Sequence, residues 1–233
     1  MLWVLLGIVL TLIVVGHYWE PPERKPLARQ PKDHFSTFSN RAAVHEAGHV
    51  VAAWCCTLVH KIGDITIEHK QGGVTAFWTI QKESPESHWC YIVILLSGMA
   101  AEMSAYGKTR SGGCGPDLES ALEKAKLIAK SGSSDPPWGV PPCKYTPDFA
   151  NMITALDPVH KRILTASYCM AYSILEAHGN DFYRIVTVLL TRKTASASDI
   201  ESVLGPRAFI KLMGIPVAKG WVRPTFILPI MQA

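Results

Sequence analysis

Two histidines and a glutamate stand inside an otherwise apolar run, as HEAGH at residues 45–49 within the segment AVHEAGHVVAAW. Burying an imidazole or a carboxylate costs free energy unless a partner satisfies it. The flanking valines and alanines predict that this cluster lies in the core, on a helix that begins at Ser39 or Asn40 and runs to about Leu58. The chain must therefore fold so that these polar groups meet a partner.

A metal ion is the partner that this spacing favours. Residues four apart share one face of a helix, so His45 and His49 can bind the same ion. Two imidazoles and a third ligand leave one position of a tetrahedral zinc site open for water, and Glu46 can then act as the general base. This is the HExxH pattern of zinc metallopeptidases, and a solvated histidine pair is the alternative. Gly48 disfavours a helix by about 1 kcal/mol relative to alanine, so we expect a metal or a tightly packed neighbour beside it.

The third ligand has to come from another part of the chain. Glu102 lies within an apolar stretch, SGMAAEMSAYG, where a carboxylate needs a partner. Asp117 lies in GGCGPDLESA, at an expected helix start, where an acid also serves as a cap. The distal histidines are further candidates, and spacing alone does not choose among these residues.

Three segments, AVHEAGHVVAAW, LLSGMAAEMSAYG and GGCGPDLESALEKA, resemble in order and spacing the peptidase domain of the FtsH family of membrane-anchored zinc proteases. The resemblance covers about residues 38–205. It implies one Zn²⁺ per chain and a hydrolytic function. It gives Glu102 no ligand role, so we expect that residue to support a ligand histidine or to pack between helices. The site residues that the resemblance implies are the metal ligands His45, His49 and Asp117 and the catalytic base Glu46.

The chain also departs from the family. FtsH proteins carry an ATPase module, whereas no GxxxxGK[ST] motif occurs in these 233 residues. We therefore expect a peptidase that cleaves unfolded, flexible or membrane proteins without its own ATPase, or that works beside an ATPase-bearing homologue. Met99 replaces an arginine that is common in the family. Pro116 precedes Asp117, where proline suits the first turn of a helix.

The predicted fold is mainly α with a small β-hairpin sheet, a zincin-like helical peptidase domain of the FtsH type. The hairpin covers residues 63–80 and turns at Gly72-Gly73. Its second strand is expected to be an edge to which an extended substrate can add, although it could equally only cover the core. The substrate-binding residues predicted on this strand are Val74, Ala76 and Trp78.

Helix signals divide the remainder of the domain. A helix is predicted from Ser84-Pro85 to Tyr106, and the glycine-rich turn SGGCGPD leads into a third helix. A proline-rich loop at residues 131–150 follows. Later helices are predicted from Asp157-Pro158 to about His178, from Asp181 to Arg192, and after a capping box at Ser198 and Glu201.

The amino terminus predicts a membrane anchor. Residues 1–19 carry no charged side chain, which is close to the ~20 residues that cross a bilayer as a helix. A cleaved signal peptide is the alternative, but it would have a basic start. A proline-rich linker over residues 20–38 contains Arg24 and Lys25, so the positive-inside rule places the peptidase domain (39–205) on the cytoplasmic or equivalent organellar side. The tail, 206–233, is expected to be irregular.

Composition limits the possible partners. A formal net charge of +4, without a basic stripe, argues against nucleic-acid binding. Six cysteines without a CxxC pair are interpreted as reduced thiols. The family resemblance implies a homo-oligomer, a hexamer in FtsH proteins, although much of the stability of that hexamer could come from the ATPase ring.

Two other functions compete with a peptidase. One is a non-catalytic, FtsH-like protein that binds or regulates an ATPase-bearing protease complex; the intact HExxH argues against it and the absent P-loop for it. The other is a structural metal site closed by four protein ligands, for which Cys114 is the candidate fourth ligand.

Overall fold

The computed structural model describes nine parts of the chain: residues 38–56, 58–69, 72–79, 84–109, 111–132, 134–137, 147–205, 209–212 and 215–218. The chain divides into two units, Met1–Gln30 and Pro31–Ala233, and all described residues belong to the second. The predicted anchor at residues 1–19 and the linker up to residue 37 lie outside the described residues, so both stay predictions.

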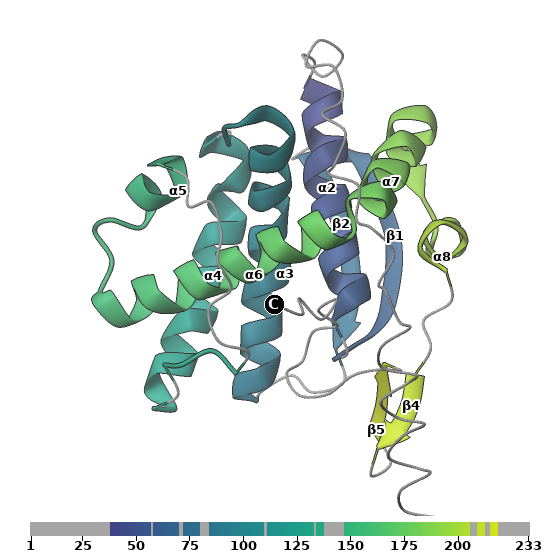
Figure 1. Ribbon diagram of the computed structural model, residues 1–233. Helices are drawn as coiled ribbons and strands as arrows, with labels where there is room; N and C mark the ends of the chain where they lie inside the picture. The colour runs from purple at the N-terminus through teal and green to yellow at the C-terminus, as the bar shows by residue number, and fades with distance from the viewer. Residues whose placement is uncertain are drawn as a thin grey trace, which may run out of the picture. The chain divides into compact units, whose positions relative to one another are not determined.

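Helix α3 (Pro85–Tyr106) is the centre of the domain. It packs against α2 (Phe38–Cys55), α4 (Ser111–Lys130) and α6 (Pro158–Ala177), and α6 crosses α3 and α4 (Figure 1). Among the described helices, α3 is the one that is long and apolar enough to span a membrane, and 67% of its most apolar window is buried inside the protein. Its apolar character therefore serves the core. Helix α7 (Gly179–Arg192) packs on α2.

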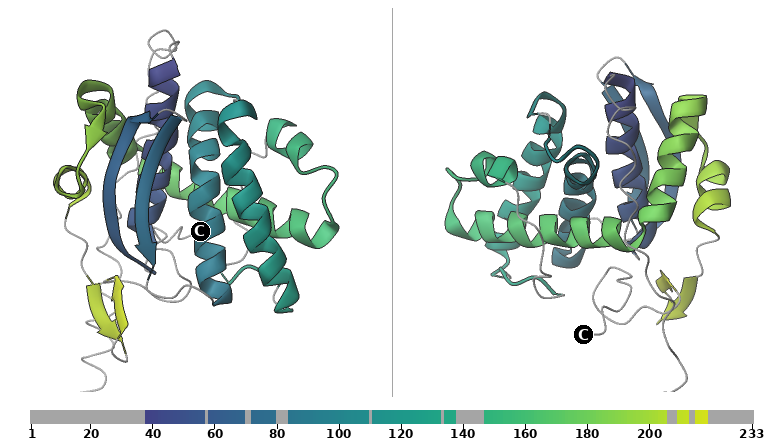
Figure 2. Two further views of the ribbon diagram at one scale, coloured as in Figure 1. Left: turned by 180° about the vertical axis from the view of Figure 1, so that it is seen from behind. Right: turned by 45° about the horizontal axis from the view of Figure 1, so that its top comes forward.

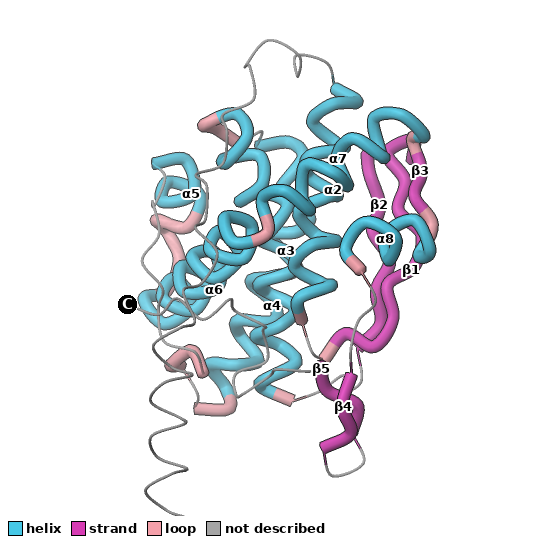
Figure 3. Tube along the Cα trace, turned by 45° about the vertical axis from the view of Figure 1, so that its right-hand side comes forward, coloured by secondary structure: helices cyan, strands magenta, loops and turns pink. Residues whose placement is uncertain are grey.

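A three-stranded antiparallel sheet covers another side of α2, with the strand order β2-β1-β3. Figure 2 (left) shows the two long strands side by side along α2, and Figure 3 shows the strands together at one side of the helices. The bounds are Val59–His69 for β1, Gly72–Thr79 for β2 and Thr194–Ala195 for β3. Because β1 is in the middle, β2 is an edge strand of the described sheet. The fold class predicted from the sequence is confirmed.

The hairpin differs from the prediction at its turn, and its register determines which residues of β2 face the helices. His69 pairs with Gly72, so Gly72 and Gly73 belong to strand β2 and do not form the predicted turn. Side chains alternate between the faces of a strand, and Phe77 contacts the ring of Tyr91 on α3 with 5.3 Å between centroids. The face of β2 that carries Gly73, Thr75 and Phe77 therefore packs against the helices, while Val74 is 42% exposed.

The predicted helix starts are confirmed where a cap and a proline coincide. Ser84 caps α3: its hydroxyl accepts a hydrogen bond from the backbone N–H of Ser87, whose hydroxyl in turn accepts one from the N–H of Ser84. The helix ends at Tyr106 as predicted. Helix α6 follows Asp157, whose carboxylate accepts from the backbone N–H of Val159. Both caps satisfy amide groups that have no partner within the helix.

Other boundaries were predicted wrongly. Helix α4 already begins at Ser111, so the glycine-rich segment is helical and Pro116 lies inside the helix, beyond its first turn. The capping box of α8 (Ala197–Leu204) is formed by Ser196 and Asp199 instead of the Ser198–Glu201 pair. Both pairs fit the capping pattern. The first is used because β3 ends at residue 195 and the chain enters the helix directly afterwards.

Two further elements were not predicted. A short helix, α5 (Pro147–Met152), follows the proline-rich segment. The tail that was expected to be irregular contains an antiparallel hairpin of β4 (Phe209–Leu212) and β5 (Ile215–Ala218). Each strand has only four residues, too short for its alternation to stand out in the sequence.

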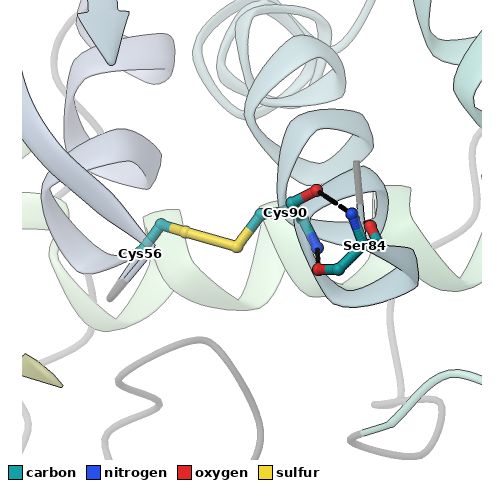
Figure 4. The surroundings of a disulfide bond; sticks show 4 residues. Cys56, Ser84 and Cys90 are labelled. Atoms are coloured by element: carbon teal, nitrogen blue, oxygen red, sulfur yellow. Dashed lines mark hydrogen bonds between the residues drawn. A yellow bond between two sulfur atoms is a disulfide. The ribbon is translucent and has the colours of Figure 1, made fainter. Parts of the chain in front are cut away.

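A disulfide between Cys56 and Cys90 joins the end of α2 to α3 (Figure 4), with 6.7 Å between the Cα atoms. Both residues are buried, and Cys169 is disulfide-bonded as well. The prediction of reduced thiols is therefore wrong for these cysteines. Cysteine pairing cannot be deduced from a sequence alone, since it depends on which helices the fold brings together.

Candidate metal centre

Three potential ligands from two helices meet beside α3. His45 and His49 lie one turn apart on α2, with their ring centroids 4.7 Å apart. Asp117 is on α4, and its Oδ2 lies 2.9 Å from His45 Nε2 and 3.4 Å from His49 Nε2. The three ligand atoms are all within 4.8 Å of one another. The structure thus brings together the three residues predicted as ligands.

The inner nitrogen of each imidazole is held by α3. His49 Nδ1 donates a hydrogen bond to the backbone carbonyl of Ile94 over 2.7 Å. His45 Nδ1 lies 2.9 Å from Glu102 Oε1, and its N–H donates to that carboxylate. A partner of this kind fixes the tautomer and the ring orientation of a metal-binding histidine. Sequence spacing had not excluded Glu102 as a ligand. In the structure Glu102 contacts Nδ1 of His45, whereas Asp117 contacts Nε2 of the same ring.

The tautomer that these hydrogen bonds favour suits a bound cation. With a proton on each Nδ1, each neutral ring has a lone pair at Nε2, and both lone pairs face the acceptor oxygen of Asp117. Protonating both rings would place two cations with their centroids only 4.7 Å apart. One divalent ion satisfies all three acceptors, and a set of two nitrogens and one carboxylate oxygen is typical of catalytic zinc.

Asp117 is strongly biased towards its ionised form. Burial raises its pKa, but without a metal a protonated Nε2 of His45 or His49 donates to Asp117, and these hydrogen bonds and charge interactions outweigh burial and hold the pKa below the ordinary range. A ligand carboxylate has to be ionised to bind a metal. Asp117 is therefore in the required state at neutral pH.

Gly98 on α3 lies against the ends of both imidazole rings. A Cβ at this position would lie 2.6 Å from His45 Nε2 and 2.7 Å from His49 Nε2. The ends of both rings can approach the helix only because this residue has no side chain. The following residue, Met99, is buried in the core with 1% exposure, which accounts for an apolar side chain where the family commonly has arginine.

Gly48 lets α2 and α3 pack closely. A Cβ there would lie 2.5 Å from the backbone oxygen of Ser97 and 2.8 Å from Ala101 Cβ. The tightly packed neighbour that was expected beside Gly48 is therefore α3. The close approach brings the HExxH residues within reach of the Ile94 carbonyl and Glu102.

Glu46 follows His45 on α2, and its side chain contacts the edge strand β2. Its side chain is buried, with 3% of the residue exposed. Thr75 on β2 donates a hydrogen bond from Oγ1 to Glu46 Oε2 over 2.6 Å. Gly73, two residues earlier, lies so close that a Cβ there would overlap the Glu46 carboxylate. The sheet therefore determines where this carboxylate lies.

Glu102 is also linked to the outer end of α2. Its Oε2 lies 3.9 Å from Arg41 Nε, and the Arg41 guanidinium lies over the ring of Tyr106, 4.7 Å from the centroid. Burial, with a further contribution from the Glu102 charge, raises the pKa of Tyr106 to about 12 against the lowering effect of Arg41. This cluster keeps a charged partner beside the buried carboxylate.

Sequence reasoning missed Thr75, Gly73, Gly98 and Arg41. Gly98 lies in a quoted motif, and its spacing from Glu102 is the one signal that could have found it. The three residues predicted to bind substrate on the edge strand differ in exposure. Val74 points outwards, Ala76 is half-buried, and the side chain of Trp78 lies outside the described residues.

Within the part of the chain that the structure describes, the metal-binding group formed is His45, His49 and Asp117, and the described distal histidines are not part of it. The side chain of Cys114, the candidate fourth ligand, is outside the described residues. Three ligands and an adjacent glutamate on an HExxH helix define a metal centre of the metallopeptidase class.

The model of Peptidase family M41 matches residues 37–203, and the chain belongs to this family. It is 27% identical over 185 residues to an ATP-dependent zinc metalloprotease FtsH of Parabacteroides distasonis. This alignment covers 72% of this chain and 26% of that protein. It is 27% identical over 202 residues to the ATP-dependent zinc metalloprotease YME1L of Drosophila melanogaster, covering 78% of this chain and 26% of that protein. The prediction of an FtsH-type peptidase domain is confirmed, and the family implies zinc as the cofactor.

The chain spans about a quarter of the length of these relatives. The matched part contains all the residues of the candidate metal centre.

Proposed function

We propose that this chain is a zinc-dependent endopeptidase that cleaves unfolded or flexible proteins. His45, His49 and Asp117 hold the metal, and Glu46 is the catalytic base. The observation that carries the proposal is the convergence of three potential ligand atoms within 4.8 Å of one another, together with the buried Glu46 of the same HExxH segment, whose carboxylate is held by a different element.

Zinc in such a site supplies a Lewis acid that polarises a peptide carbonyl and acidifies water. Glu46 accepts the proton of the attacking water and passes it to the leaving amine nitrogen. Thr75 hydrogen-bonds one carboxylate oxygen of Glu46, which leaves the other for the proton transfer. Glu102 and the Ile94 carbonyl hold the two imidazoles in the tautomer that presents Nε2 to the ion.

The edge strand β2 is the proposed site of substrate binding. An extended peptide can add to the free edge of a sheet through backbone hydrogen bonds, which gives affinity with little sequence preference. This strand contacts Glu46 through Thr75, so a peptide on it would lie near the base. Val74, Ala76 and Trp78 alternate with the residues that face the helices, and we propose that they contact substrate side chains.

Membrane attachment through residues 1–19, a homo-oligomer and work beside an ATPase-bearing homologue are parts of the same proposal. The uncharged amino-terminal segment supports the anchor. These 233 residues contain no P-loop, so any use of ATP would depend on residues or proteins outside them. A substrate that is already unfolded should therefore be cleaved without ATP.

The test compares the full chain with its Glu46→Gln variant, both purified in mild detergent and loaded with zinc. Wild type is expected to cleave reduced, denatured casein without ATP and to stop when a chelator is added. The variant is expected to keep one zinc per chain and to lose cleavage. A folded, zinc-loaded wild type that leaves casein intact would refute the proposal and support a non-catalytic, partner-binding protein.

A further inference from the structure

Thr75 occupies a position that neither the HExxH pattern nor the metal ligands explain. It lies in the middle of β2, paired with Ile65 of β1. Its hydroxyl reaches α2, where Oγ1 lies 2.6 Å from Glu46 Oε2 and 3.4 Å from the Glu46 backbone oxygen. A hydrogen bond from a hydroxyl to a carboxylate at this length is charge-assisted and stronger than one between neutral groups.

Gly73 completes the contact. Residues two apart lie on the same face of a strand, so Gly73 and Thr75 both face α2. Thr75 holds the Glu46 carboxylate, while Gly73 leaves the space that the carboxylate fills. The Gly73 backbone does not have a positive φ, so a left-handed conformation does not explain the glycine. The close approach to Glu46 does.

We propose that Thr75 is a positioning residue for the catalytic base, and that Gly73 provides the space for that position. The inference rests on the proposed role of Glu46. A substrate that adds to β2 would then be bound by the same strand that orients the base. The position of the substrate backbone and the position of the Glu46 carboxylate would be set by one element.

A purely structural role for Thr75 makes different predictions. Threonine favours strands because its branched side chain packs well on a pleated surface, and valine shares that property. Thr75→Val therefore keeps the shape and removes the hydroxyl, whereas Thr75→Ser keeps the hydroxyl. Thr66→Val is the matched control: Thr66 lies on β1, and its hydroxyl accepts from the backbone N–H of Glu68.

The kinetic test measures kcat, KM and zinc content of the full-length variants with denatured casein. For Thr75→Val we expect kcat to fall at least about tenfold, but by no more than the ~10²- to 10⁴-fold that a general base contributes in full. KM should stay within about twofold, and zinc should stay at one per chain. Thr75→Ser should recover most of kcat, and Thr66→Val should match wild type. Unchanged kcat in Thr75→Val, or an equal loss in the Thr66 control, would overturn the inference.

Crystal structures of zinc-loaded wild type and Thr75→Val give a readout that needs no turnover. We expect one Glu46 conformation, bonded to Thr75, in wild type and a displaced or multiple conformation in the variant. If wild type does not cleave casein but shows this difference, the positioning role stands and the proposed function fails. An identical Glu46 conformation in both crystals would refute the positioning role.

Discussion

Substituting Gly98 by alanine should abolish zinc binding without unfolding the protein. The added methyl group would lie 2.6 Å from His45 Nε2 and 2.7 Å from His49 Nε2. Ordinary van der Waals contact begins at 3.4 Å. Each ring would therefore have to move by about 0.7 to 0.8 Å, the difference between these distances. A metal site tolerates deviations of only about 0.2 Å in its ligand distances.

The rings have little freedom to move by that amount. His45 is held by Glu102 and His49 by the Ile94 carbonyl, both from the helix that carries Gly98. That helix cannot retreat easily, because the Ser97 backbone is packed against Gly48. The clash therefore acts on the two Nε2 atoms that have to bind the ion.

The assay is a zinc titration of the apo protein in competition with a chromophoric chelator, with circular dichroism to confirm folding. Gly115→Ala is the control, since a Cβ at that position meets no atom within 4 Å. Gly98→Ala should bind no zinc at concentrations that saturate wild type, whereas Gly115→Ala should bind normally. Zinc binding by Gly98→Ala with the wild-type Kd would refute the geometry of this site.

Three other perturbations test neighbouring parts of the account. Glu102→Gln should weaken zinc binding by about 10- to 100-fold, because a ligand histidine loses its carboxylate partner; exposed Glu123→Gln should leave the same titration unchanged. Replacing both Cys56 and Cys90 by serine should lower the free energy of unfolding by about 3–4 kcal/mol, because the disulfide closes a loop with a sequence separation of 34. Urea unfolding measures this change, and an unchanged midpoint would argue against the disulfide. Burial raises the pKa of Tyr106 from 10.0 to about 12. The tyrosine therefore ionises first in the unfolded chain, and the stability of the fold should decrease as pH rises from 10 to 12. Tyr106→Phe should lessen that decrease in thermal melts, and an identical pH dependence would exclude this contribution.

The part of the site that lies on one helix could be predicted from the sequence. The i, i+4 spacing of His45 and His49 fixes their common face, and the apolar neighbours fix its burial. The limits of α3 were predictable because Ser84 and Pro85 give a local start signal. Asp117 was different. It is far from the two histidines in the sequence, so spacing made it and Glu102 equally good candidates for the third ligand, and a family resemblance was needed to choose it.

What the sequence could not supply depends on pairing between distant segments. Thr75 meets Glu46 only because β2 pairs with β1 in one register and the sheet lies on α2. A shift of one residue reverses the faces of a strand, and the predicted turn at Gly72-Gly73 did not fix that register. The bond between Cys56 and Cys90 likewise follows from the packing of α2 on α3.

The most direct test of the account is a crystal structure of the full chain with zinc, measured with anomalous scattering at the zinc edge. The account predicts one peak about 2.0–2.2 Å from His45 Nε2, His49 Nε2 and a carboxylate oxygen of Asp117, with the fourth position open to water. A site closed by Cys114 would make the zinc structural. A peak elsewhere, or no peak between these three residues, would contradict the account.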